Sequence, residues 1–209
     1  MIWIGETLVS RGEGGVYGEK LIGDYRIWDP YRSKLAALYY LGHTPELTCD
    51  MRVLYLGAAN GTTVSHVADY VECVYAVEMA PRPMQDLLAI ARRRENIIPI
   101  MADARHVESY AALLETVDLI YQDIAQPDQV AIAINNSIFL RSGGVIIIAL
   151  KTRSISVAEN PEVILRRAEG ELVNAGFRIA RSGWLDPYQH DHAVLICLRE
   201  PDGNAHCSG

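Results

Sequence analysis

Short apolar segments recur along the chain from about residue 50, and amphipathic stretches separate most of them. A short continuous apolar run rich in Val, Ile and Leu is typical of a strand buried on both faces of a sheet. The predicted strands are "RVLYLG", "CVYAVE", "IIPIMAD", "VDLIYQD", "GGVIIIALK", "FRIAR" and "AVLICL". Helices are expected at roughly residues 62–70, 81–94, 107–115, 127–140 and 160–175. Strands that alternate with helices indicate an α/β fold with a mostly parallel sheet.

The last two predicted strands are joined through "SGWLDPYQHDH" with no helix between them. We therefore expect an antiparallel pair at one edge of the sheet, with the last strand running against the others. The predicted fold is a Rossmann-like, mostly parallel seven-stranded sheet.

The first 45 residues follow a different pattern. "IWIGETLV" and "VYGEKLIG" are short segments on either side of "SRGEGG", whose glycines suit a hairpin connection. Residues 1–45 are therefore expected to form a small β-hairpin region and a helix, and residues 46–200 the main domain. Residues 201–209 are expected to be a disordered tail.

The predicted helix of the N-terminal region lies in "DYRIWDPYRSKLAALYYLG". Asp29 followed by Pro30 favours a cap and first turn, and Gly42 favours the end of the helix. Lys34 falls on the apolar stripe of this helix, where the pattern calls for a leucine. Its stem can cover apolar surface while its ammonium group reaches water, or this end of the stripe can border a functional cleft.

Composition narrows the class of protein. The 209 residues are half hydrophobic and carry a formal net charge of −7. The longest apolar run, "VIIIAL", is far too short to span a bilayer, and Glu6 interrupts the N-terminal segment, so no membrane association and a cytoplasmic location are expected. An acidic chain is poorly suited to hold nucleic acid alone, because phosphate neutralisation by Lys and Arg supplies most non-specific affinity.

No metal site is indicated. The four cysteines contain no CxxC pair, which leaves neither a zinc site nor a disulfide framework. "HDH" at residues 190–192 offers two histidines without a third ligand.

The ends of the predicted parallel strands indicate a ligand site. Ligands of open α/β sheets bind beyond the carboxyl ends of the strands. In "LGAANGTT", Gly57 and Gly61 would let the backbone approach a ligand, and Thr62 and Thr63 would open the next helix. Glycine after a strand is also commonly just a turn.

Acidic residues at three further strand ends strengthen this interpretation. Glu78 lies 17 residues beyond Gly61 (78 − 61), close to the offset of about 20 at which a carboxylate meets a ribose diol. Asp103 and Asp123 end the next two strands and would face the same ligand, although Asp103 can equally cap a helix.

The glycine pattern bears on the nature of the ligand. Ala59 and Thr62 stand where a dinucleotide fingerprint requires glycine, and no lysine follows Gly61 as in a phosphate-binding loop. A nucleoside without phosphates fits better, and S-adenosylmethionine is one. Its ribose would meet Glu78, its adenine would lie near Asp103, and its amino-acid end would lie near Gly57 and Asp123.

Seven motifs resemble the fibrillarin family, in particular its archaeal branch. They are "YRIWDPYRSKLAAL", "VLYLGAANGTTVSHVAD", "VYAVEMAPRPMQDLL", "NIIPIMADARH", "VDLIYQDIAQPDQ", "ALKTRSI" and "DPYQHDHAVL". The resemblance runs from about Val16 to Leu198. It implies the sheet of class I S-adenosylmethionine-dependent methyltransferases, and RNA ribose 2′-O-methylation directed by a box C/D guide RNA to rRNA and tRNA. It also implies two protein partners, a Nop-domain scaffold and a kink-turn-binding ribosomal-type protein.

Matched motif by motif, the resemblance extends the cofactor-binding set. The expected set is Gly57, Ala58, Gly61, Thr62, Thr63, Glu78, Met79, Asp103, Ala104, Asp123, Ile124, Ala125 and Gln126.

Four groups are expected to meet the ribose hydroxyl. Lys151 ends the fifth predicted strand as Asp123 ends the fourth, and His192 begins the last strand at the same edge. Lys34, from the helix before the sheet, could complete the set, which then matches the Lys-Asp-Lys-His tetrad that the resemblance implies. Lys151 would lie nearest the 2′-hydroxyl, Asp123 would orient it, and Lys34 and His192 would support it. A lysine after a strand is also commonly only a solvated residue.

Arg32 and Arg153 are the expected phosphate contacts beside this site. Two other functions remain open on the residues alone. One is a small-molecule O-methyltransferase on the same fold, and the other is a non-catalytic cofactor-binding scaffold.

Overall fold

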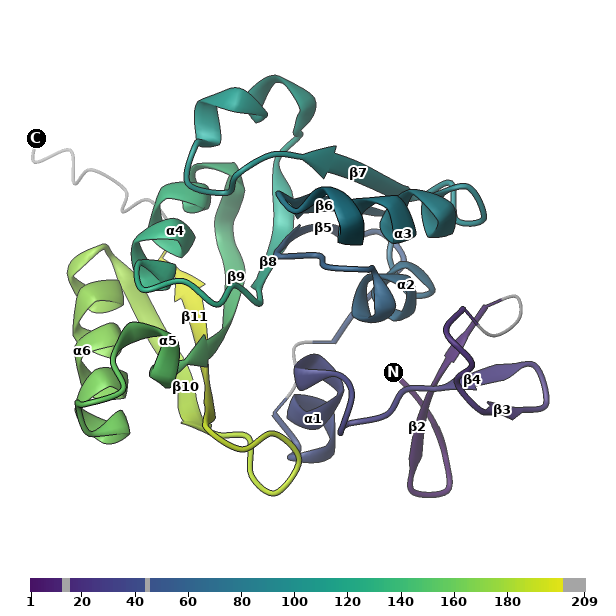
Figure 1. Cartoon of the computed structure of the whole chain (residues 1–209), viewed down its shortest axis with the longest axis horizontal. Coiled ribbons are helices and arrows are strands. Elements are labelled where there is room, and N and C mark those ends of the chain that lie inside the picture. The colour runs from purple at the N-terminus through teal and green to yellow at the C-terminus, as the bar shows by residue number, and fades with distance from the viewer. Residues whose placement is uncertain (13–15, 44–45, 201–209) are drawn as a thin grey trace, which may run out of the picture.

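A computed structural model describes residues 1–12, 16–43 and 46–200, and it is built around a seven-stranded sheet (Figure 1). The strand order is β10-β11-β9-β8-β5-β6-β7. The strands are β5 (Arg52–Leu56), β6 (Cys73–Glu78), β7 (Ile97–Met101), β8 (Val117–Gln122), β9 (Leu140–Lys151), β10 (Phe177–Trp184) and β11 (His192–Arg199). Strands β5 to β9 pair in parallel, whereas β11 is antiparallel to both β9 and β10. The predicted sheet, with its antiparallel last strand, is confirmed.

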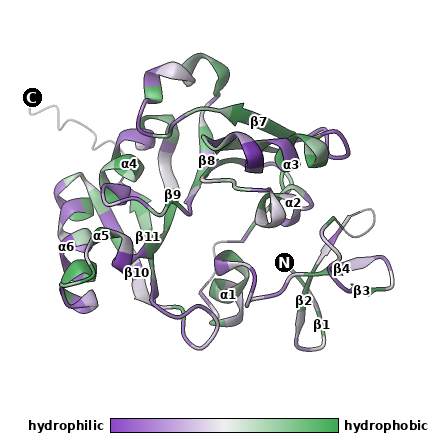
Figure 2. Cartoon of the chain, viewed as in Figure 1, coloured by the Kyte–Doolittle hydropathy of each residue, from purple (hydrophilic) through white to green (hydrophobic). Residues whose placement is uncertain are grey.

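Helices cover both faces of the sheet. Val53 and Tyr55 of β5 pack in one cluster with α1 (Lys34–Tyr40), α2 (Thr62–Ala68) and α3 (Pro81–Ala91). Leu54 and Leu56 pack in the other cluster with α4 (Gln129–Asn136) and α6 (Pro161–Asn174). Hydrophobic residues concentrate on the central strands between these layers (Figure 2). Burial on both faces explains why these strands are continuous apolar runs rather than alternating ones.

The helix expected at residues 107–115 is absent from the described structure. Two short 3₁₀ turns, η1 (Val107–Ser109) and η2 (Ala111–Leu113), stand in its place. Tyr110 separates them with a non-helical φ of −134°. In the core its hydroxyl donates to Asn136 Oδ1 and lies 3.3 Å from the Ala104 carbonyl oxygen. Burial of this ring, 1% exposed, fixes a backbone conformation that an α-helix would not allow.

Two smaller differences concern the other helices. The helix expected at 127–140 ends at Asn136 and continues as a 3₁₀ turn, η3 (Ser137–Phe139). A one-turn helix that the pattern did not predict, α5 (Thr152–Ile155), follows β9 directly.

The N-terminal region is a four-stranded antiparallel sheet of order β1-β2-β4-β3. Its strands are β1 (Ile2–Ile4), β2 (Thr7–Arg11), β3 (Leu21–Ile22) and β4 (Tyr25–Ile27). "IWIGETLV" is therefore a hairpin in itself, turning at Gly5 with φ +59°, and not a single strand. Residues 13–15 of "SRGEGG" and the predicted tail at 201–209 lie outside the described residues.

Helix α1 begins later than predicted. Ser33, not Asp29, is its N-cap, and the Ser33 Oγ accepts a hydrogen bond from the Ala36 N–H at 3.2 Å. The Asp29 carbonyl instead accepts from the N–H groups of Arg32 and Ser33, which makes a turn ahead of the helix. Lys34 is consequently the first residue of α1.

Buried polar side chains join the N-terminal sheet to α2. Arg26 is fully buried, and its guanidinium contacts Glu19 at 2.6 Å and Asp69 at 2.8 Å. Ser10 Oγ lies 2.7 Å from His66 Nδ1 and donates to Asp69 at 2.6 Å. These contacts fix the sheet that precedes α1 against the helix that follows β5, and so help to place Lys34 relative to the strand ends.

Candidate active site

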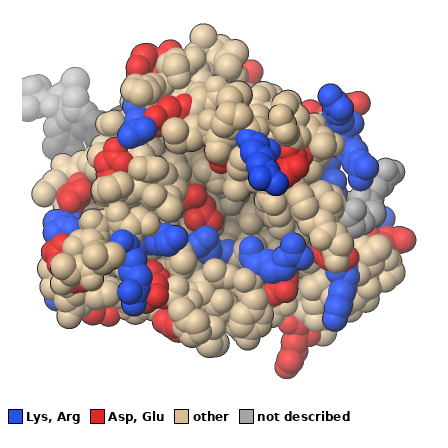
Figure 3. Space-filling view, viewed as in Figure 1, with Lys and Arg blue, Asp and Glu red and all other residues tan. Residues whose placement is uncertain are grey.

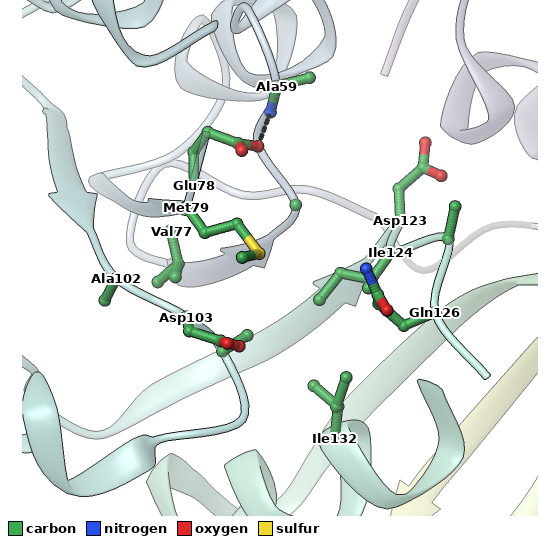
Figure 4. Close-up of a pocket in the computed structure, with 13 residues that line it drawn as sticks. Ala59, Val77, Glu78, Met79, Ala102, Asp103, Asp123, Ile124, Gln126 and Ile132 are labelled. Carbon is green, nitrogen blue, oxygen red and sulfur yellow. Dashed lines mark hydrogen bonds between the residues drawn. The ribbon is translucent and has the colours of Figure 1, made fainter. Parts of the chain in front are cut away.

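A cleft of about 640 Å³, open to solvent, lies at the carboxyl ends of the central parallel strands (Figure 4). This is where open α/β sheets bind ligands. Its lining is made by the end of β6, by the loops after β5, β6, β7 and β8, and by one residue of α4. The lining residues are Gly57, Ala59, Val77, Glu78, Met79, Ala102, Asp103, Ala104, Asp123, Ile124, Ala125, Gln126 and Ile132.

The loop after β5 passes close to the end of β8. Gly57 has a φ of +80°, and a Cβ added there would lie 2.5 Å from the Asp123 carbonyl oxygen. Ala59 also has a positive φ, +48°. Only a residue without a side chain allows this close approach at position 57, which brings the two walls of the cleft together.

The Glu78 carboxylate is held at the wall of the cleft by backbone groups. The Ala59 N–H donates to its Oε2 at 2.8 Å, and the Ala80 N–H donates to its Oε1 at 2.7 Å (Figure 4). Each carboxylate oxygen can accept a further hydrogen bond, so the group suits a vicinal diol.

Asp103, which follows the neighbouring strand β7, is held by Arg105. The guanidinium donates to both carboxylate oxygens, with Arg105 Nη2 at 2.6 Å from Oδ2 and Nε at 3.0 Å from Oδ1. This pairing lowers the pKa of Asp103 and keeps it ionised. The next helical element, η1, has His106 as its N-cap, so the alternative role of Asp103 as a helix cap is wrong.

The lining favours a ligand that is partly apolar and carries positive charge. Hydrophobic side chains lie between the carboxylates, and no residue in the lining is a cation. Such a cleft would repel phosphate groups, whereas a sulfonium or an ammonium group would be attracted to Glu78, Asp103 and Asp123. These residues therefore fit a nucleoside such as S-adenosylmethionine.

Nine of the predicted cofactor residues line this cleft, whereas Ala58, Gly61, Thr62 and Thr63 do not. Thr62 Oγ1 bonds Asn60 Oδ1 at 3.1 Å, and Thr63 Oγ1 bonds Ser33 Oγ at 3.1 Å. Cofactor binding by these residues stays a prediction.

Sequence reasoning missed four lining residues, Ala59, Val77, Ala102 and Ile132. Three of them lie within two residues of a position that was predicted. The pattern of residues at the strand ends could therefore have predicted these three. Ile132 lies in α4, and nothing in the sequence pattern marked it as a lining residue.

The four groups expected at the ribose hydroxyl come together beside the cleft. Lys34 Nζ lies 2.9 Å from Asp123 Oδ2, and the two side chains are 20% and 29% exposed. Lys151 and His192 are direct partners across the antiparallel β9–β11 pair. Residues directly opposite in such a pair point to the same face of the sheet.

The electrostatics of His192 link it to the other three groups. Burial lowers the pKa of His192, and Lys34 and Lys151 lower it further, while the His190 carbonyl and Asp123 act in the opposite direction. His192 Nδ1 lies 2.8 Å from the His190 carbonyl oxygen, to which it must donate. In the neutral ring, Nε2 is therefore left as an acceptor.

The loop before His192 is fixed to the segment before Lys34. Gln189 Nε2 donates to the Pro30 carbonyl at 2.8 Å. The Tyr188 ring packs edge-on against Tyr31, with centroids 5.3 Å apart. These contacts hold two site-bearing segments together although they are distant in sequence.

The two arginines expected to contact phosphate lie at the surface. Arg32 is exposed, and Arg153 is paired with Asp191, its Nε 2.9 Å from Oδ2. Figure 3 shows Lys and Arg side chains in a row across this face of the molecule. Phosphate contact by Arg32 and Arg153 stays a prediction.

The described residues contain neither a metal-binding cluster nor a membrane-spanning helix. No group of three or more His, Cys, Asp or Glu side chains there is arranged to hold a metal ion, and His190 Nδ1 lies 2.6 Å from Asp186 Oδ1. No helix among these residues has the length and apolar character needed to cross a membrane.

The fibrillarin family model matches residues 6–201. Over 199 residues the chain is 63% identical to a fibrillarin-like rRNA/tRNA 2′-O-methyltransferase of Methanoculleus marisnigri, covering 95% of this chain and 99% of that protein.

Solved structures agree with this match. A chain in a fibrillarin/Nop5p complex has a TM-score of 0.88 and 45% identity, covering 92% of this chain and 94% of that one. Fibrillarin of Aeropyrum pernix, solved with natively bound S-adenosyl-L-methionine, has a TM-score of 0.80 and 43% identity, covering 90% of this chain and 85% of that one.

Proposed function

The chain belongs to the fibrillarin family, and from this premise we propose that it is an S-adenosylmethionine-dependent 2′-O-methyltransferase of ribosomal and transfer RNA. The observation that carries the proposal is the position of Asp123. It lines the acidic cleft and also pairs with Lys34, beside Lys151 and His192. Asp123 thus belongs both to the cleft that would hold the methyl donor and to the group of side chains that would bind the ribose hydroxyl.

The cofactor assignment rests on the chemistry of the cleft. S-adenosylmethionine, when bound, supplies the electrophilic methyl group of its sulfonium. Glu78 would accept hydrogen bonds from the ribose hydroxyls, Asp103 would lie beside the adenine, and Asp123 would accept from the methionine ammonium group. The relatives support this choice, since the fibrillarin of Aeropyrum pernix binds the same molecule.

The remaining groups would act on the ribose. The 2′-oxygen forms a bond to the methyl carbon as the sulfur–carbon bond breaks, and the hydroxyl proton passes to a base at the site. Lys151 would lie nearest the hydroxyl, and Asp123 would orient it. Lys34 and His192 would help to position it, and Lys34 would supply positive potential. Holding the reactants in line is worth up to about 7–11 kcal/mol of the barrier.

The distribution of lysine supports these roles. The chain has 19 lysines and arginines, of which only Lys20, Lys34 and Lys151 are lysines. Two of the three therefore lie at the site, while arginine supplies the positive charge elsewhere except at Lys20. Arginine does not lose its proton in proteins, whereas a lysine can, so lysine is the cation suited to proton transfer.

We further propose that the protein works as the catalytic subunit of a box C/D guide RNA complex. Its net charge of −7 leaves RNA binding largely to other components. A Nop-domain scaffold is the first expected partner, because a relative was solved as a fibrillarin/Nop5p complex. A kink-turn-binding ribosomal-type protein and the guide RNA complete the proposed assembly, in the cytoplasm.

The proposal is tested by reconstituting the complex with a guide RNA and measuring methyl transfer to a matching RNA. Lys151→Ala should abolish transfer, whereas Lys20→Ala, at an exposed position of the N-terminal region, should not affect it. Wild-type rates for Lys151→Ala would refute the catalytic assignment. A screen of small metabolites with labelled cofactor tests the rival function, since transfer to a metabolite but not to guided RNA would favour it.

A further inference from the structure

Gln129, the last residue of the "YQDIAQPDQ" motif, has no role in the site as described so far. It is the first residue of α4 and is fully buried, at 0% exposed. Burial of a primary amide is costly unless its donors and acceptors are matched, so its partners identify what it does.

All partners of the Gln129 side chain are backbone groups of the site. Its Nε2 donates to the Gln126 carbonyl at 2.9 Å and to the Lys151 carbonyl at 3.1 Å. Its Oε1 accepts from the Lys151 N–H at 3.0 Å. Gln126 lines the cleft, and Lys151 is the amine assigned to the ribose hydroxyl.

The sheet explains why an amide is needed at this point. Strand β8 ends at Gln122, which pairs with Ile148, whereas β9 continues to Lys151. On the side of β9 that faces β8, the last residues therefore have no strand to pair with. The Gln129 carboxamide has one donor and one acceptor side like a peptide group, and it pairs with Lys151 as a strand would.

We propose that Gln129 is a positioning residue that fixes the Lys151 backbone relative to the cofactor loop, residues 123–126. The Gln129 side chain hydrogen-bonds the backbone of Gln126 and the backbone of Lys151 at the same time. It would therefore set the distance between the Lys151 amine and the methyl donor bound in the cleft. Gln122 fixes the backbone of Gln129, because its Nε2 donates to the Gln129 backbone carbonyl at 2.6 Å. This inference rests on the proposed methyl transfer.

Two variants separate hydrogen bonding from size. Gln129→Glu keeps the shape, but an ionised carboxylate cannot donate to either carbonyl. Gln129→Met keeps the length and removes all three hydrogen bonds. Because a shift of about 1 Å at a reacting group lowers rates by about 100-fold, we expect both variants to slow transfer by roughly 10- to 100-fold.

The control is Asn96→Asp. Asn96 Nδ2 also donates to two backbone carbonyls, Ala68 at 2.8 Å and Val71 at 3.0 Å, but it lies at the opposite end of the parallel strands. The same amide-to-acid change there should lower the melting temperature and leave methyl transfer at the wild-type rate.

The assay is single-turnover methyl transfer in the reconstituted complex at saturating cofactor, at a temperature where each variant is folded by circular dichroism. A purely structural role would lower the melting temperature without slowing this step. The pH profile adds a second readout, since the new carboxyl group regains one donor when it is protonated. The rate of Gln129→Glu relative to wild type should rise as pH falls, while that of Gln129→Met should not.

The outcomes are distinguishable from failure of the proposed function. An inactive wild-type complex would count against the methyltransferase proposal itself. An active wild type with wild-type rates in both Gln129 variants would overturn only the positioning role, as would equal slowing by Asn96→Asp. If Gln129→Glu fails to fold, the rate of Gln129→Met decides the question.

Discussion

The buried His66 should make the protein sensitive to mild acid. His66 is 3% exposed and stacks on Trp28, with ring centroids 5.0 Å apart and planes 8° apart. Burial lowers its pKa to about 3, and the nearby guanidinium of Arg26 contributes in the same direction. The Ser10 hydroxyl has one hydrogen, which it donates to Asp69, so His66 Nδ1 must donate to Ser10. With a pKa of about 3, the ring is neutral in the folded protein near pH 7, and its one N–H is on Nδ1.

The folded and unfolded proteins differ in the pH at which His66 gains a proton, and this difference determines how stability changes with pH. Between about pH 3 and 6.5, the unfolded chain binds a proton on His66 that the folded protein does not. Stability therefore falls as pH falls through this range. At about pH 5 the loss from this residue alone is about 2 kcal/mol, which is 1.36 kcal/mol for each pH unit below 6.5.

His66→Asn isolates this contribution. The asparagine amide can still donate to Ser10 from a position near the original Nδ1, but it does not titrate. Urea unfolding is followed by tryptophan fluorescence and circular dichroism from about pH 7.5 to about pH 5. The free-energy difference between wild type and variant should shrink by about 2 kcal/mol over this range. Since His43 and His192 titrate in both proteins, a difference that stays constant would refute the account of His66.

Three further predictions concern the N-terminal sheet and the site. Arg26→Met leaves the carboxylates of Glu19 and Asp69 buried without this guanidinium, and it should lower the unfolding free energy by about 3–5 kcal/mol in urea titrations. Glu78→Gln should weaken cofactor binding by roughly 10- to 100-fold in calorimetric titrations, because hydrogen bonds to a charged group contribute about 1.5–3 kcal/mol. Lys34→Met should slow methyl transfer at least about 10-fold while leaving the unfolding free energy equal or higher, since a cation at a helix N-terminus is unfavourable by about 0.3–1 kcal/mol.

Each of these predictions has a matched control. Arg52→Met removes surface ion pairs to Glu72 and Glu115, and it should lower stability by less than about 1 kcal/mol. Glu108→Gln, at an exposed position, should leave cofactor affinity unchanged, and Lys20→Met should leave methyl transfer unchanged. An Arg26→Met protein no less stable than the Arg52→Met protein would contradict the assignment of the buried network.

The sheet and the strand-end acids were predictable because their signals are local. A strand buried on both faces needs a continuous apolar run, and a parallel sheet places every strand's carboxyl end at one edge. Glu78, Asp103 and Asp123 follow such runs directly, so their position could be inferred without knowing any side-chain contact.

The features that were missed depend on partners distant in sequence. The break at Tyr110 arises from its contact with Asn136, 26 residues away. The bond of Thr63 to Ser33 spans 30 residues. Gln129 is read as an ordinary helix residue until Lys151, 22 positions further on, is placed beside it. Periodicity contains no information about such pairs.

Lys34 shows how the site and the stability of the fold oppose each other. It is the first residue of α1, and the first turn of that helix contains no acidic residue to balance its charge. The helix dipole therefore disfavours a cation there. The compensating charge comes from Asp123, 89 residues away and 2.9 Å from the ammonium group. The pair is partly exposed, so it contributes at most about 1 kcal/mol to folding. A lysine at this position is best explained by its charge at the edge of the cleft, because the helix itself would be served at least as well by an apolar side chain.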